Sequence, residues 1–173
     1  MRILRFAAGL VIATFVEVLG LRFFAPFCQV VDPFLILVVY TSLEAPPAWS
    51  MLGGSAAGLS QDALTGGLYG LHGFADTLVA WIAARLKQHV VIQRPRQVGL
   101  LFALAAGLQQ ALLAVLQFLT VPGSELPGPG TTAAKIAAAG LLGAGLFVAT
   151  GRLRGGIGEW RRRRSRRLKI EVE

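Results

Sequence analysis

Long apolar stretches alternate with short connections rich in proline, glycine or charge along this chain of 173 residues. A helix needs about 20 mostly apolar residues to cross a bilayer, and about 17 at the minimum. On that basis the sequence predicts six membrane-spanning helices, roughly at residues 4–21, 30–44, 48–64, 67–84, 98–121 and 132–150. The connections contain helix-breaking sequence, such as the two consecutive prolines of "EAPPA" at 44–48. The predicted fold class is all-α, a polytopic membrane bundle of six transmembrane helices.

Composition indicates that lipid surrounds these helices. Hydrophobic residues make up 54% of the chain and charged residues 15%, whereas a soluble domain usually has about 25% charged residues. The net charge is +8, but the basic residues lie mostly at the N-terminus, in 85–96 and in 152–169, where they flank apolar segments. Basic flanks are typical of the cytoplasmic side of a membrane protein. Since no nucleic-acid-binding motif accompanies the charge, we expect no nucleic-acid partner.

The asymmetry of this charge also predicts orientation and domain organisation. With six spans, both termini and the connections at 44–48 and 85–97 lie on one side, which then holds nearly all the lysines and arginines. The connection at 121–130, on the other side, contains neither. Because positively charged loops stay in the cytoplasm, we expect both termini there. Residues 1–151 would form the transmembrane domain and residues 152–173 a basic cytoplasmic tail.

The tail carries a cluster of arginines soon after the last apolar segment: Arg161, Arg162, Arg163, Arg164, Arg166 and Arg167. Such a cluster attracts anionic lipid headgroups with about 1 kcal/mol per charge near the surface. A plain topology anchor would have the same composition, and both roles can hold together. We regard these arginines as candidates for contact with anionic lipid at the cytoplasmic face.

Small residues recur at helical spacing within the predicted spans. Gly54 and Gly58 have G-x-x-x-G spacing, and the later stripes are Gly66, Gly70, Gly73, Thr77, Ala80 and Ala84, then Ala103, Gly107, Gln110, Ala114 and Gln117, and Ala133, Ala137, Gly140 and Ala144. Lipid supplies no hydrophobic force between helices, so thin faces of this kind serve as packing seams. They could also form a groove for a partner's helix, with the candidates Gly54, Gly58, Asp62, Gly66, Gly70 and Gly73.

Several polar residues fall inside the predicted spans: Glu17, Asp62, His72, Asp76, Gln109, Gln110 and Gln117. An acid in the middle of a bilayer costs about 2.5–3.5 kcal/mol on insertion scales, so it should face protein or water. His72 and Asp76 are four residues apart, so we expect them on one helix face with Tyr69. Asp62, His72 and Asp76 permit two interpretations. They could form a proton relay or a polar pocket, or Asp62 could cap the N-terminus of the next span or pair with a neighbouring helix. Hydrogen bonds between helices explain the glutamines.

Signatures of enzymes and metal sites do not occur in the sequence. C-x-x-C, H-E-x-x-H and G-x-x-x-x-G-K-[ST] are missing, and "GGSAA" departs from G-x-S-x-G at Ala57. The single cysteine, Cys28, cannot form an internal disulfide. We therefore expect no enzymatic activity, no catalytic residue, no cofactor and no metal site.

The segment at 32–86 contains three pattern elements in chain order. An aspartate opens the second predicted span, the sequence G-x-x-x-G-L-x-x-D lies in the third, and a G-L pair lies in the fourth. The matching residues are Asp32, Gly54, Gly58, Leu59, Asp62, Gly70 and Leu71. In this pattern, in its length and in its basic ends, the chain resembles the rod-shape-determining MreD family of bacterial inner-membrane proteins. The resemblance implies a fold similar to the substrate-binding membrane subunits of energy-coupling vitamin transporters.

The same resemblance implies a non-catalytic inner-membrane subunit of the cell-elongation (rod) complex, one that organises peptidoglycan synthesis and maintains cell shape. Its implied partner is MreC, a bitopic membrane protein, with MreB filaments, RodA and a class B penicillin-binding protein as indirect partners. The similarity to vitamin transporters supplies the alternative, a small-molecule (vitamin) binding subunit with a chamber that opens outward. The predicted outer loops are short and contain no tryptophan, which favours the scaffold over a lidded pocket.

Overall fold

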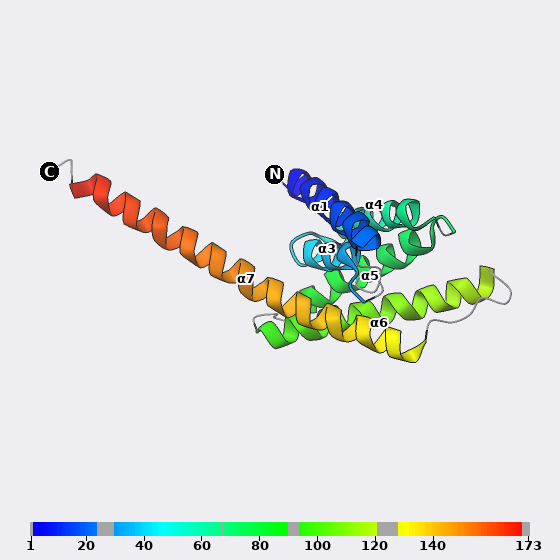
Figure 1. Cartoon of the computed structure of the whole chain (residues 1–173). Coiled ribbons are helices and arrows are strands. Elements are labelled where there is room, and N and C mark those ends of the chain that lie inside the picture. The colour runs from blue at the N-terminus through cyan, green and yellow to red at the C-terminus, as the bar shows by residue number, and fades with distance from the viewer. Residues whose placement is uncertain (1, 24–29, 67, 90–93, 121–127, 171–173) are drawn as a thin grey trace.

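The computed structural model describes residues 2–23, 30–66, 68–89, 94–120 and 128–170, with side chains for all of these except Arg2, His89 and 151–170. Within these residues the chain forms six α-helices: α1 (Arg2–Phe23), α3 (Pro33–Ser42), α4 (Pro47–Thr65), α5 (Leu71–His89), α6 (Pro95–Thr120) and α7 (Pro129–Ile170). The helices pack as a bundle, and α7 runs beyond it toward the C-terminus (Figure 1). The prediction of an all-α bundle is confirmed.

In the part of the chain that the structure describes, three helices are long and apolar enough to cross a membrane: Ile3–Phe23 of α1, Pro95–Thr120 of α6 and Pro129–Thr150 of α7. Helices α4 and α5 have 19 residues each, but their glycines and polar side chains lower their mean hydropathy. Helix α3 has 10 residues, so it is about 15 Å long and covers about half of the hydrocarbon thickness. It is shorter than the span predicted at 30–44, and the six-span topology stays a prediction.

Helix α3 forms the centre of the bundle. It contacts α1, α4, α5, α6 and α7, and its buried residues include Phe34, Leu35, Val38 and Val39. A helix that is apolar on all sides is stable when other helices surround it. Phe34 and Val38 belong to an apolar cluster with residues of α1, α4 and α5, whereas Leu35 and Val39 pack with α5, α6 and α7. The two halves of the bundle therefore meet on α3.

Helices α4 and α5 form a hairpin whose backbones come very close. A Cβ atom at Gly54 would collide with the carbonyl oxygen of Asp76, and a Cβ atom at Gly58 would collide with the backbone of His72. At Gly73 of α5, an added Cβ atom would lie 3.0 Å from Leu59 Cδ2. These three glycines form the packing seam that the sequence predicts, because side chains at their positions would push the helices apart.

The predicted stripe is wrong at Gly66 and Gly70, which lie in the turn between the helices. Helix α4 ends at Thr65 and α5 begins at Leu71, so the fourth predicted span starts four residues too early. Gly66 has φ 66° and Gly70 has φ 99°, conformations that glycine adopts without a steric penalty. The two residues are spaced like members of a helix face, but the chain uses them to reverse direction.

Helices α6 and α7 make a second seam. A Cβ atom at Gly140 would lie 3.4 Å from the Cβ atom of Ala103, and one at Gly99 would lie 3.2 Å from that of Ala144. The predicted stripes therefore contact each other at Ala103 and Gly140, whereas Ala144 faces Gly99, which no predicted stripe includes. Helix α7 has 42 residues without a break, so the predicted boundary at 151/152 falls inside a helix. The side chains of the six tail arginines lie outside the described residues, as does Cys28.

Candidate functional site

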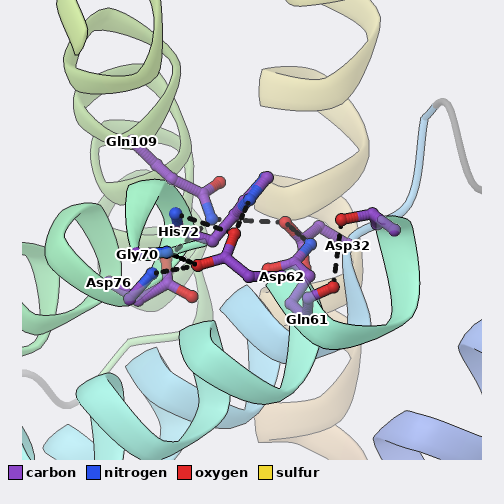
Figure 2. Close-up of polar contacts among 9 residues, drawn as sticks. Asp32, Gln61, Asp62, Gly70, His72, Asp76 and Gln109 are labelled. Atoms are coloured by element: carbon purple, nitrogen blue, oxygen red, sulfur yellow. Dashed lines mark hydrogen bonds and ion pairs between the residues drawn. The ribbon is translucent and has the colours of Figure 1, made fainter. Parts of the chain in front are cut away.

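The carboxylate of Asp62, near the end of α4, binds the first turn of α5. It accepts hydrogen bonds from the backbone N–H groups of Gly70 at 2.8 Å, His72 at 3.1 Å and Gly73 at 3.2 Å. It also contacts the imidazole Nδ1 of His72 at 2.7 Å. Figure 2 shows the Asp62 carboxylate turned toward Gly70 and His72. The interpretation of Asp62 as the cap of the following helix describes this geometry.

The local sequence explains why a residue of another helix provides this cap. Gly70 immediately precedes α5 and accepts the bond from the N–H of Phe74 at 2.8 Å, so it occupies the N-cap position. Its φ of 99° favours glycine, and glycine has no side-chain oxygen to satisfy the free N–H groups of the first turn. The first turn of α5 also contains no acid. Asp62 supplies both the acceptor and the negative charge that a helix N-terminus favours.

The contact with Asp62 fixes the tautomer of His72. A carboxylate accepts hydrogen bonds, so Nδ1 of His72 carries the proton in the contact with Asp62 Oδ1. In the neutral ring, Nε2 is then an acceptor. The Asp62 side chain is 1% exposed and the His72 side chain 23% exposed. His72 therefore lies against the carboxylate, and its own side chain stays partly accessible.

A second set of polar contacts joins α3, α4, α5 and α6. Asp32 caps α3, since its Oδ1 accepts the N–H of Leu35 at 2.9 Å. The Oδ2 atom of Asp32 accepts from Gln61 Nε2 at 3.1 Å and from Gln109 Nε2 at 3.2 Å. The same nitrogen of Gln109 donates to Asp76 Oδ1 at 2.7 Å. Figure 2 shows these side chains beside Asp62, and we call the five residues Asp32, Gln61, Asp62, Asp76 and Gln109 the polar network.

Gln109 makes the buried carboxylate of Asp76 and the half-buried carboxylate of Asp32 compatible with one bundle. Its amide nitrogen has two protons, so one can go to Asp32 and the other to Asp76. Asp76 is fully buried and Gln109 is 1% exposed. Leaving such groups without hydrogen bonds would cost about 1–3 kcal/mol each on mutational scales. The network therefore fixes the distances among α3, α5 and α6.

The remaining predicted polar residues are placed differently. Glu17 of α1 and Gln110 of α6 are buried, and Gln117 is half-buried. Tyr69, expected on one helix face with His72 and Asp76, lies in the turn before α5 and is 75% exposed. That prediction is wrong because the helix starts two residues later than Tyr69.

Sequence reasoning missed the roles of Asp32, Gln61 and Gln109 in the network. The sequence does indicate that Gln61 faces a neighbouring helix, because Gln61 lies three residues after Gly58 and therefore on the same helix face as Gly54 and Gly58. Gln109 was explained as one of several helix-to-helix amides, and its two acceptors lie 33 and 77 residues away in the chain. Among the residues that the structure describes, no three His, Cys, Asp or Glu side chains are placed to hold a metal ion.

Comparison with known proteins places the chain in a family. Residues 1–123 match the model of the family described as rod shape-determining protein MreD. The match covers more than half of the chain and includes α1, α3, α4, α5 and α6, and with them the whole polar network. Neither the curated proteins nor the solved structures gave a significant match.

Proposed function

Because this chain belongs to the rod shape-determining protein MreD family, we propose that it acts as a non-catalytic subunit that binds an MreC-like bitopic protein in the inner membrane. Through that partner it would connect indirectly to MreB filaments, RodA and a class B penicillin-binding protein and so organise peptidoglycan synthesis. Both termini would lie in the cytoplasm, where the tail arginines contact anionic lipid.

The observation that supports this proposal is that α4 has two thin faces. Gly54 and Gly58 face α5, so a partner's helix has no access to that seam. On the opposite side of α4, Ala56 and Ala63 are exposed, and at Gly66, in the turn after the helix, an added Cβ atom would meet nothing within 4 Å. Ala56 and Ala63 are seven residues apart and so lie on one face of the helix; we call this face, with Gly66 in the turn at its end, the outer face of α4.

A bitopic protein has one apolar helix, which must dock from the side. Inside lipid, such docking depends on close contact at small residues and on a few hydrogen bonds. The outer face of α4 offers two alanines and a terminal glycine for this contact. We therefore propose that the partner's helix docks on this face. This proposal replaces the predicted docking site at Gly54 and Gly58, which α5 covers. Gly66 stays in the groove, and Gly70 and Asp62 lie near its end.

Two leucine substitutions on opposite faces of α4 test the proposal. Ala56→Leu should lower the recovery of the MreC-like partner per folded molecule and leave the abundance of the chain nearly unchanged. Gly58→Leu should lower abundance, because the seam with α5 cannot accept a side chain without separation of the helices. The matched control is Ala149→Leu, at an exposed alanine of α7.

The measurement is co-purification of the partner from membranes, normalised to folded chain by size-exclusion chromatography in detergent. Unchanged partner recovery with Ala56→Leu, or an equal loss with Ala149→Leu, would show that the partner does not dock on the outer face of α4. The alternative function, a vitamin-binding subunit, predicts a small molecule retained in one-to-one ratio by the purified chain, which native mass spectrometry would detect.

A further inference from the structure

One oxygen atom of Asp76 has no hydrogen-bond donor among the described residues. Oδ1 of Asp76 accepts from Gln109 Nε2 at 2.7 Å, whereas no described residue donates to Oδ2. The side chain is fully buried. A buried carboxylate oxygen is unfavourable without a donor or a cation, because it has lost its hydration and has gained no other partner. The described contacts therefore satisfy only half of this carboxylate.

A second buried acceptor of the polar network also has no donor. Gln61 is 6% exposed, and no described residue donates to its Oε1 atom. Its Nε2 atom donates to Asp32 Oδ2 at 3.1 Å, and Nε2 and Oε1 share one amide carbon, so Oε1 also lies within the network. The network thus contains two buried oxygen atoms, one charged and one neutral, that can still bind a donor or a cation.

The carboxylates of the polar network outnumber the positive charges that contact them. Their one ion pair within the described residues is with the imidazole of His72. Neither Arg22 at the end of α1 nor Lys135 of α7 forms an ion pair with the three aspartates. Residues 24–29 and 67, which are not described, contain no lysine or arginine. A neutral donor would satisfy an oxygen atom but would leave the buried negative charge, so the network favours a cation.

The basic side chains that the structure does not describe belong to the other end of the bundle. Arg2 precedes Ile3, and the basic tail follows Thr150. Ile3 and Thr150 line a cavity together with Glu44, which follows the end of α3. Asp32 lies at the opposite end of α3, about 15 Å away along the helix axis. Arg2 and the start of the tail are therefore separated from the network by the length of α3.

The available ligand atoms indicate the type of cation. Zinc and calcium sites use several histidine, cysteine or carboxylate ligands, and no three such side chains among the described residues are placed to hold a metal ion. Alkali cations need less charge, because neutral carbonyl oxygens can replace their hydration shell. Asp76 Oδ2 offers one negative charge, and Gln61 Oε1 offers an amide oxygen. Ionisable residues inside membrane proteins often mark ion sites of this kind.

We propose that the polar network binds one alkali-metal cation, Na⁺ or K⁺, with the carboxylate of Asp76 as its charged ligand and the amide oxygen of Gln61 as a neutral one. Gln109 positions Asp76 through the hydrogen bond to Oδ1 and leaves Oδ2 for the cation. The cation offsets one buried charge where residues of α4, α5 and α6 meet, and it stabilises the folded bundle because the unfolded chain does not form the site. This proposal does not depend on the partner.

Thermal unfolding of the full chain in a non-ionic detergent tests the proposal. Helicity is followed by circular dichroism at neutral pH in NaCl, KCl or choline chloride of equal ionic strength. A cation at ten times its Kd lowers the unfolding constant about tenfold, so the apparent melting temperature should be about 3–5 °C higher in NaCl or KCl than in choline chloride. Equal melting temperatures in the three salts would overturn the proposal, and a dependence on pH alone would overturn it in favour of a bound proton.

Variants assign the effect to the network. Asp76→Asn keeps the size of the side chain and removes its charge, so its melting temperature should be the same in the three salts. Gln61→Leu removes the amide oxygen and should reduce the difference between salts. The matched control, Glu44→Gln, removes a carboxylate at the other end of α3 and should keep the full difference. If Asp76→Asn keeps the difference as well, the cation does not bind at the polar network.

A direct measurement decides the matter if Asp76→Asn does not fold. Equilibrium dialysis of the unmodified chain with radioactive Na⁺, or with Rb⁺ in place of K⁺, should give one bound ion per chain. Gln61→Leu should bind the same ion more weakly, and Glu44→Gln should bind it as the unmodified chain does. No bound ion, or equal binding by Gln61→Leu and the unmodified chain, would show that this site does not hold an alkali cation.

Discussion

Replacement of Asp62 by alanine should destabilise the chain by about 1.5–5 kcal/mol. The carboxylate satisfies three backbone N–H groups of the first turn of α5. Loss of a helix cap costs about 0.5–2 kcal/mol. The bond to Gly73 is buried, and a buried N–H group without an acceptor adds about 1–3 kcal/mol. Gly70 and His72 are partly accessible, so water can replace the carboxylate at their N–H groups and we add nothing for them.

The assay is unfolding of the purified chain in mixed micelles, with the fraction of denaturing detergent raised stepwise and helicity followed by circular dichroism. His72→Ala is the matched control, because it removes the side-chain contact with Asp62 and leaves the three backbone bonds in place. Its effect should be below about 1 kcal/mol, as expected for a side chain that is 23% exposed. If Asp62→Ala is no less stable than His72→Ala, the carboxylate does not act as the cap of α5.

Two further predictions concern the network and the topology. Gln109→Leu should destabilise the chain by about 2–5 kcal/mol, because it removes the donor shared by two carboxylates in the bundle. The control Gln88→Leu, at an exposed position of α5, should cost less than about 1 kcal/mol, and equal unfolding midpoints would refute the role of Gln109. In a background without the native cysteine, Ser124→Cys should react with an impermeant thiol reagent in intact cells and Ser165→Cys should not. The reverse labelling would contradict cytoplasmic termini.

The helices and their seams could be predicted from the sequence because both depend on local spacing. G-x-x-x-G at Gly54 and Gly58 indicates a thin face wherever the helix packs, and the structure places that face against α5. The prediction failed at Gly66 and Gly70, since a spacing of four residues does not distinguish a helix face from two turn residues. The two cases differ in the backbone angle φ, which is positive at both turn glycines. The sequence does not reveal this angle, because glycine adopts positive and negative φ about equally well.

The candidate site was predictable in part for the same reason. Asp62 lies eight residues before Gly70, and a short turn between antiparallel helices brings such residues together, so a cap was among the interpretations. The bonds of Asp32 with Gln61 and Gln109 span 29 and 77 residues. They depend on the placement of α3 in the centre of the bundle, and no short-range pattern encodes that placement.

Helix α4 has a glycine face toward α5 and an exposed alanine face, and this arrangement explains why glycine and alanine are not interchangeable there. At Gly54 and Gly58 the backbone of α5 occupies the space of a Cβ atom, and this approach brings Asp62 within reach of the N–H groups that it caps. At Ala56 and Ala63 the side chains are exposed, and a helix docking there would meet methyl groups. The glycine face is therefore required for folding of the hairpin, whereas the alanine face is exposed. Substitutions on the glycine face should change the amount of folded protein. Substitutions on the alanine face should change the amount of partner that each folded molecule retains.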